Sequence, residues 1–444
     1  MNKSLFAVAA GVWVCGLVAV GHSAPQYAKP PAPADAPTYS KEVAPILYKN
    51  CTNCHRPGEI APMSLLTFKD ARPWATSIRE RVSLGEMPPW HADPAHGQFL
   101  NDRRLSDAEK ETIVKWVAAG APEGNPADLP PQPTYAEGWL MGQPDVVLGM
   151  GEDYPVPASG TIEYKYFEVP TNFTEDKYIQ SMEVRAGNRA VVHHVIVFAR
   201  APQPEQRAAV FKFADGMGIP KKDETDKPVN DRPAPQRMGA SIGGFAPGQF
   251  GRVYQPGTAV RLPAGSVLVF QIHYTANGTA TTDRTTIGLK LAKEKPKDEV
   301  RMSALINGAF TIPAGAGDHR VDAEVTLVQD VTLWSMLPHT HLRGKRWEYQ
   351  VTYPDGKTET LLSVPKYDFN WQTDYIFKEP LKLAKGTKIH ATAWYDNSPN
   401  NPSNPNPKVD VKWGDQTWEE MMFTSLNYTV NPPAATPSAE PKER

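Results

Sequence analysis

Proline most strongly limits what this chain can fold into, because it occupies 44 of the 444 positions, roughly twice its average share. A proline inside a helix removes a backbone hydrogen bond and clashes with the preceding turn, so the chain cannot be mainly helical. Short strands joined by turns tolerate proline better. The formal net charge of −2 indicates no broad basic surface, and we expect no nucleic-acid partner.

The N-terminus has the pattern of a secretory signal peptide over residues 1–24. Lys3 supplies the positive charge, an apolar run extends from Leu5 to Val20, and Ser23 and Ala24 offer small residues for cleavage. A membrane anchor is the alternative, but the run is short for a span and a Pro/Ala-rich linker, residues 25–37, follows it. We therefore expect a bacterial protein that is periplasmic or secreted, with no stable membrane span after signal cleavage.

Helical patterns are confined to residues 38–124. The run from Lys41 to Lys49 leads into a cysteine motif, and Ser106 to Glu109 forms a capping box before apolar residues at helical spacing. Residues 125–139 are proline-rich and are predicted to be a linker.

From about residue 140 the pattern changes to an alternation of period two, with turn residues between the runs. This favours two antiparallel β-sandwiches of the jelly-roll type, over residues 140–300 and 301–430. Residues 202–251 are predicted to be an insertion or loop, and residues 431–444 a disordered tail. The strongest predicted strands are Ala190–Phe198, Ser266–Tyr274, Glu324–Leu333, Arg346–Tyr353 and Lys388–Tyr395.

Cys51, Cys54 and His55 form the Cys-x-x-Cys-His pattern that is typical of covalent haem attachment. The two thiols can reach the two vinyl groups of one porphyrin, and the histidine that follows presents its imidazole to the iron. A zinc half-site would need further cysteines or histidines, and a redox dithiol would not need the histidine. The third cysteine, Cys15, lies in the signal, so we predict one haem c and no structural disulfide.

The sixth iron ligand is predicted to be Met87, in a proline-rich loop some thirty residues after the motif. Met63, His91 and His96 are the alternatives. A thioether opposite histidine raises the haem potential and suits an electron carrier. The segment from Tyr39 to Ala121 resembles a class I cytochrome c domain, which implies an all-α fold for this part of a multidomain α + β protein.

Five histidines outside the haem motif fall in three tight sequence contexts. His339 and His341 are two residues apart, so on a strand both would project from one face. His193 and His194 are adjacent and would point to opposite faces, so sharing a metal would require a strand edge, a β-bulge or different ring nitrogens. His273 could supply a third nitrogen.

These motifs, in this order, resemble those of the copper type II, ascorbate-dependent monooxygenases, which include peptidylglycine alpha-hydroxylating monooxygenase and dopamine beta-hydroxylase. The resemblance rests on His-His in an apolar strand (193–194), Gln-x-His-Tyr (271–274), His-Thr-His before Leu-Arg-Gly-Lys (339–345) and Trp-Glu-Glu-Met (418–421). It implies two coppers on two β-sandwiches. The first, electron-passing copper would be bound by His193, His194 and His273, and the second, catalytic copper by His339, His341 and Met421, with Met422 as the alternative to Met421.

The resemblance also has departures, because animal members use several disulfides for which this chain has no cysteines. The combined expectation is a monooxygenase that inserts one atom of O2 into an unknown small organic substrate. The haem domain would accept electrons from a periplasmic donor and pass them through the first copper to the second. The alternative is a non-enzymatic electron-transfer or copper-binding haem protein. A carbohydrate-binding β-protein is a third interpretation, but sugar contact does not need histidine clusters.

Overall fold

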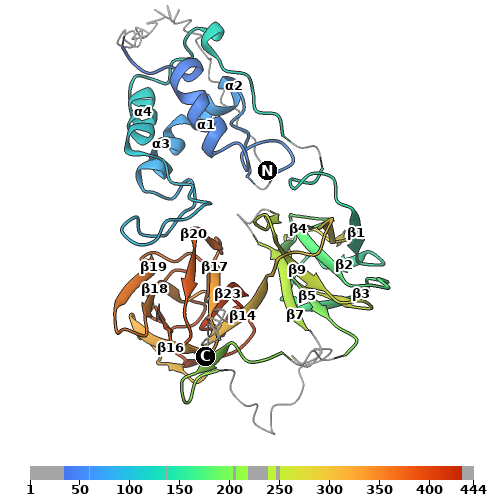
Figure 1. The fold of residues 1–444 in the computed structure, drawn as a ribbon. Coiled ribbons are helices and arrows are strands. Elements are labelled where there is room, and N and C mark those ends of the chain that lie inside the picture. Colours follow the sequence, from blue (N-terminus) through green and yellow to red (C-terminus); the bar gives the residue numbers. More distant parts are fainter. Residues whose placement is uncertain are drawn as a thin grey trace, which may run out of the picture.

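A computed structural model describes residues 35–59, 61–135, 138–203, 207–218, 239–246 and 251–432. Three hydrophobic cores organise them: a helical segment at the top of Figure 1, and two β-sandwiches that lie side by side below it. We call these the helical segment (residues 39–128), sandwich 1 (residues 146–299) and sandwich 2 (residues 301–430). The predicted signal peptide and all of the predicted tail except residues 431–432 lie outside the described residues.

The helical segment carries the cysteine motif directly after its first α-helix. The capping box predicted at Ser106 and Glu109 is confirmed, since each side chain accepts a hydrogen bond from the other residue's backbone N–H. The helices are η1 (Tyr39–Val43), α1 (Ala44–Asn50), α2 (Phe68–Ala71), η2 (Arg72–Trp74), α3 (Ala75–Ser83), α4 (Asp107–Ala118) and η3 (Pro126–Asp128).

The prediction of an N-terminal all-α class I cytochrome c domain over residues 38–124 is wrong. Strands make up 38% of the structure and helices 12%, and α1 to α4 span only 7, 4, 9 and 12 residues. The chain between α3 and α4 leaves the helical core, and Trp90, Ala92 and Phe99 pack in the core of sandwich 2. The physical reason is that Pro88 and Pro89 cannot continue a helix, and the aromatic residues beyond them are buried by tertiary packing against a sheet edge.

Sandwich 1 buries its core between two sheets, where side chains such as Ile179 and Leu289 meet Val197 and Phe270. The pairs are antiparallel except for the parallel pair β9 and β13. The first sheet contains β1 (Val146–Gly149), β12 (Thr286–Leu291), β4 (Lys177–Arg185), β9 (Thr258–Leu262) and β13 (Asp298–Glu299), with β8 (Arg252–Val253) beside β4. The second contains β3 (Lys165–Pro170), β10 (Val267–Tyr274), β5 (Val192–Arg200) and β7 (Ala240–Phe245), and a separate pair joins β2 (Tyr154–Val156) to β11 (Thr281–Asp283).

Sandwich 2 is built in the same way from antiparallel strands. Its first sheet contains β14 (Arg301–Ile306), β23 (Phe423–Val430), β17 (Val331–His339) and β20 (Tyr375–Leu383). The opposite sheet contains β19 (Thr358–Val364), β18 (Gly344–Thr352), β21 (Lys388–Tyr395), β16 (His319–Leu327) and β6 (Phe211–Phe213), and a small pair joins β15 (Thr311–Ile312) to β22 (Val411–Lys412).

Two details of sandwich 2 correct the sequence predictions. The run Glu324–Leu333 is not one strand, because β16 ends at Leu327 and β17 begins at Val331 in the other sheet. The predicted loop 202–251 contributes strands in its described parts, and β6 pairs with β16 across the boundary between the sandwiches.

Direct contacts join the three parts. In sandwich 1, Arg252 donates to the Ser335 hydroxyl of sandwich 2 at 2.9 Å and forms an ion pair with Asp374. The segment after Pro89 lies along β20, where the N–H of Lys378 donates to the carbonyl of Gln98 at 2.8 Å. Within the described residues, no helix is long and apolar enough to cross a membrane.

Candidate metal and haem centres

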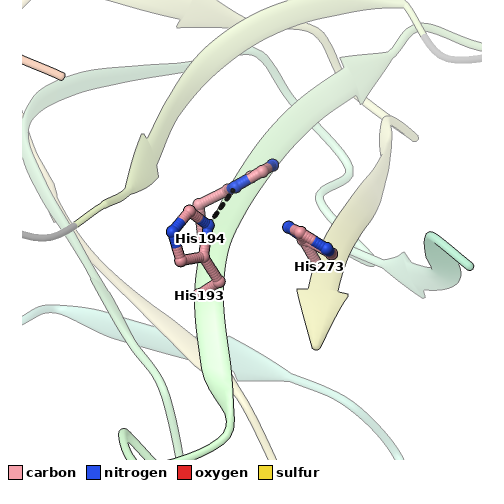
Figure 2. Close-up of side chains that lie close together, drawn as sticks. All are labelled: His193, His194 and His273. Carbon is pink, nitrogen blue, oxygen red and sulfur yellow. Dashed lines mark hydrogen bonds between the residues drawn. The ribbon is translucent and has the colours of Figure 1, made fainter. Parts of the chain in front are cut away.

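Three histidines of sandwich 1 converge at one end of β5 and β10. His194 lies opposite His273, whereas Val192 lies opposite Tyr274, so His193 is the extra residue of a β-bulge. The bulge turns two adjacent side chains toward the same space, as the sequence required for a shared metal. One ligand atom from each of His193, His194 and His273 lies within 4.8 Å of the others (Figure 2). We call this group the histidine triad.

The electrostatics of the triad favour a bound cation. The Nδ1 atoms of His193 and His194 lie 3.1 Å apart, and Nδ1 of His273 is buried without a hydrogen-bond partner. Burial lowers the pKa of His273 to about 4, helped by the neighbouring His193, and burial also lowers the pKa of His194 far below its usual value. The imidazoles are therefore neutral at pH 7, the form that offers lone pairs to a metal.

A second pair, His339 and His341, lies at the end of β17. The strand ends at His339, so the expected single strand through both residues is not formed. The rings nevertheless lie together, with centroids 5.1 Å apart. Nδ1 of His339 is 2.9 Å from the Gln372 side-chain oxygen, and Nδ1 of His341 is 3.1 Å from the Glu419 carbonyl. These acceptors orient each ring through its Nδ1.

Burial keeps this histidine pair neutral as well. It lowers the pKa of His339 to about 4 and that of His341 to about 3, where the neighbouring His339 adds to the effect. Since a neutral imidazole binds copper or zinc without first losing a proton, both rings are ready to serve as ligands at pH 7.

Of the two candidate methionines, Met421 is the one that the core of sandwich 2 leaves partly exposed. Met422 is fully buried in the core of sandwich 2, whereas Met421 is only partly buried. The buried carboxylate of Glu420 accepts hydrogen bonds from the N–H groups of His341 at 2.7 Å and Met421 at 3.3 Å. Glu420 therefore ties the backbone of the candidate methionine ligand to that of a candidate histidine ligand.

The triad and the His339/His341 pair face each other across the boundary between the sandwiches. Phe369 of sandwich 2 stacks on His193 with centroids 5.4 Å apart, and its ring centroid is 6.1 Å from that of His341. Tyr164 packs on the other side of the triad, 5.1 Å from the ring of His273. The sequence offered no signal for Phe369, Gln372 or Tyr164, because they lie outside the strands and depend on tertiary packing.

The cysteine motif folds into one turn that presents its three functional groups together. The N–H groups of Cys54 and His55 donate to the carbonyl of Cys51 at 3.1 and 2.9 Å, and both cysteines are free. Nδ1 of His55 is 3.3 Å from the Met63 carbonyl, which leaves Nε2 available for iron. These residues fit haem c.

The alternative chemistries predicted for the cysteines fit less well. Burial raises the pKa of the Cys51 thiol to about 12, whereas a reactive redox dithiol needs a lowered pKa. Among the described residues, the cluster that brings three such ligand atoms within 4.8 Å is the histidine triad, and it contains neither cysteine. A zinc site at the motif therefore gains no support from its surroundings.

The candidates for the sixth haem ligand have different surroundings in the structure. The carbonyl of Met63 is bonded to His55, and buried His91 lies beside Asp368 and Lys366 of sandwich 2. Met87 is half-buried just after α3, and its N–H donates to the Arg81 carbonyl at 3.3 Å. No contact among the described residues joins Met87 to His55, and its role stays a prediction, as does the lesser alternative His96.

Comparison with known proteins finds only solved structures of low similarity to this chain. No protein-family model and no curated protein matches the chain. Among solved structures, PNGF-II is 10% identical with a TM-score of 0.28, over 64% of this chain and 65% of that chain. The major capsid protein P2 from Bacteriophage PM2 is 7% identical with a TM-score of 0.28, over 64% of this chain and 97% of that chain. The chain thus spans just under two thirds of the length of PNGF-II.

The fold of the chain corrects the predicted family. The structure is mainly β, and the helical segment is not an all-α cytochrome domain. The predicted resemblance to type II copper monooxygenases fused to a class I cytochrome c is therefore wrong. Any functional conclusion must come from the arrangement of this chain's own residues.

Proposed function

We propose that this protein is an exported haem- and copper-dependent monooxygenase acting on a small organic substrate, with a periplasmic protein as its electron donor. The observation that carries the proposal is the convergence of five histidines from two sandwiches on either side of Phe369. Clusters of neutral, buried imidazoles with free ring nitrogens are expensive to assemble unless they bind something.

The donor sets of the two clusters suit different tasks. The histidine triad offers nitrogen atoms, which bind copper in both oxidation states, as an electron-passing site requires. His339 and His341 with Met421 add a soft thioether, which favours the Cu(I) that reacts with O2. When bound, copper would supply the redox chemistry that activates O2, and haem would supply electrons one at a time.

The reaction balances with an external donor. One oxygen atom enters a C–H bond of the substrate, and the other leaves as water with two electrons and two protons. The chain's own contribution is to hold the ligands: Gln372 and the Glu419 carbonyl orient the two rings of the second cluster, and the bulge at His193 orients the first. His55, Cys51 and Cys54 would hold the haem.

Metal and haem analysis of the purified mature protein tests the proposal. We expect one haem and two coppers per chain, and copper-dependent O2 consumption when a reductant and candidate substrates are supplied. One copper or none, with no O2 turnover, would instead identify an electron-transfer or copper-binding haem protein. Stopped-flow spectroscopy adds a kinetic check, because ferrous haem should reoxidise faster in the copper-loaded protein than in the copper-free protein under O2.

A further inference from the structure

Glu59 connects the haem-attachment loop to the strand that carries the histidine triad. It lies four residues after His55, and its carboxylate accepts hydrogen bonds from Arg56 at 3.0 Å and from Arg189 at 2.6 Å. Arg189 belongs to the loop between β4 and β5, four residues before His193. One carboxylate shared by two guanidinium groups therefore spans the junction between the helical segment and sandwich 1.

This ion pair is shielded from water on the helical side. The side chains of Glu59 and Arg56 are only 10% and 12% exposed, and that of Arg189 is 29% exposed. The guanidinium carbon of Arg56 also lies 4.3 Å from the centre of the Tyr135 ring. A charge-assisted contact that is mostly buried fixes geometry better than a surface pair of long side chains.

The packing around the pair is otherwise open. A cavity of about 390 Å³ lies beside the pair, lined by residues 56–59 on one side and by Arg185, Ala186 and Arg189 of sandwich 1 on the other, with Tyr135 along its wall. The Glu59–Arg189 contact bridges the two sides of this cavity. Arg56 and Arg189 lie close enough to Cys54 to oppose the effect of burial, which raises the pKa of its thiol.

We propose that the Glu59–Arg189 pair is the docking contact across which electrons pass from the haem held by Cys51, Cys54 and His55 to copper at the histidine triad. This inference rests on the proposed function. In the step, ferrous iron loses one electron and Cu(II) gains it, and no bond or proton is exchanged. Arg189 is a positioning residue: it holds the haem-attachment loop, through Glu59, next to the strand of His193 and His194.

A competing entry point exists, because the segment around Trp90 attaches the helical segment to sandwich 2. The Trp90 ring lies 5.1 Å from the ring of Tyr375, next to the start of β20. The loop that follows the motif, however, is in contact with sandwich 1 through Glu59 and Arg189, and the triad begins four residues after Arg189. The shorter covalent and hydrogen-bonded route therefore ends at the triad.

Charge reversal tests the docking contact in the full-length, haem-loaded and copper-loaded protein. We would measure reoxidation of ferrous haem by Cu(II) without O2 in Arg189→Glu, Glu59→Arg and the double reversal. Each single change should slow the step about tenfold, since a docking pair becomes a repulsive one, and the double change should restore most of the rate. Arg189→Lys should keep more of the rate than Arg189→Glu.

Arg200→Glu is the matched control, because Arg200 lies at the other end of β5 and pairs with Glu168 at 2.7 Å. A second readout avoids turnover altogether: in copper-free protein, Arg189→Gln should lower the haem midpoint potential, since a nearby cation favours ferrous over ferric iron.

The outcomes separate two failures. Single variants that bind haem and both coppers yet keep the wild-type rate overturn the docking role and leave the proposed function standing. An equally slow Arg200→Glu control, or a double reversal with no recovery, also overturns it. A protein that binds no copper at the triad overturns the proposed function, and this inference with it.

Discussion

The imidazole of His193 stacks on the phenyl ring of Phe369, with the two planes 21° apart. The residues belong to different sandwiches, so this contact joins the two candidate copper sites directly. Three residues further along the same loop, Gln372 holds the ring of His339. The loop that carries Phe369 and Gln372 therefore contacts the histidine triad through the Phe369 ring and orients His339 through the Gln372 amide.

Replacing Phe369 with alanine should weaken the junction between the sandwiches. Phe369 is partly buried, so we expect a loss of about 2 kcal/mol in the free energy of unfolding, below the range for a fully buried phenylalanine. Electron transfer between the coppers should slow, while the amount of bound copper stays the same. Calorimetry and single-turnover kinetics measure the two effects.

The matched control is Phe211→Ala, which removes a partly buried ring that packs on Tyr428 away from the histidines. It should lower stability by a similar amount and leave electron transfer between the coppers unchanged. Equal kinetics in the two variants would contradict the role of Phe369.

Gln372→Leu should selectively weaken copper at the second site. Loss of an outer hydrogen-bond partner of a histidine ligand typically costs about tenfold to 100-fold in metal affinity. Competition with a chelator, followed by metal analysis, would show one weakened copper and one unchanged copper. Gln329→Leu provides the control, because Gln329 donates to the Ala209 carbonyl on another part of sandwich 2.

His273→Ala should remove one copper and leave the haem and the second copper in place. His273 supplies one of three nitrogens, and its Nδ1 is buried without a hydrogen-bond partner, so alanine there leaves the triad with two nitrogens. His390→Ala is the control, because His390 pairs with Asp322 at 2.9 Å on a different sheet. Loss of haem or of both coppers in His273→Ala would count against separate sites.

The metal-free protein should lose stability as pH falls below about 6.5. Burial lowers the pKa of His339 and His341 from 6.5 to about 4 and about 3 in the folded chain. Between these values the unfolded chain binds protons that the folded chain does not, so the free energy of unfolding decreases with decreasing pH. For one such histidine, the decrease is at most about 1.4 kcal/mol for each pH unit within that window.

Thermal unfolding at pH 7, 6 and 5 measures this dependence. The variant with both His339→Gln and His341→Gln should show a flatter dependence over the same range, since it lacks the two groups. A melting temperature that is the same at pH 7 and pH 5 in the metal-free wild type would contradict the prediction.

Local patterns located many elements, because they depend on neighbours in sequence. Strand β21 occupies the predicted Lys388–Tyr395, β10 starts one residue after the predicted Ser266, and the capping box at Ser106 is formed. The bulge at His193 is one of the arrangements expected for two adjacent histidines that share a metal, beside a strand edge or the use of different ring nitrogens. These features follow from alternation, capping and side-chain direction.

What the sequence could not predict depends on contacts between distant segments. The region 38–124 has helical runs at both ends, but nothing local indicates that Trp90 and Phe99 bury themselves in sandwich 2. The same holds for β6, which leaves a predicted loop to join the far sheet. Tertiary burial decided both, and the family resemblance failed because short histidine motifs carry little information about a whole fold.

The attachment of Trp90 and Phe99 to sandwich 2 has a consequence for dissecting this protein. A gene fragment cut at residue 124 would take these two rings away from the core that buries them and would expose Tyr375 and Phe377, their neighbours. Both halves would then carry an uncovered apolar surface and be prone to aggregation. The helical segment and the two sandwiches should therefore be expressed and purified as one chain.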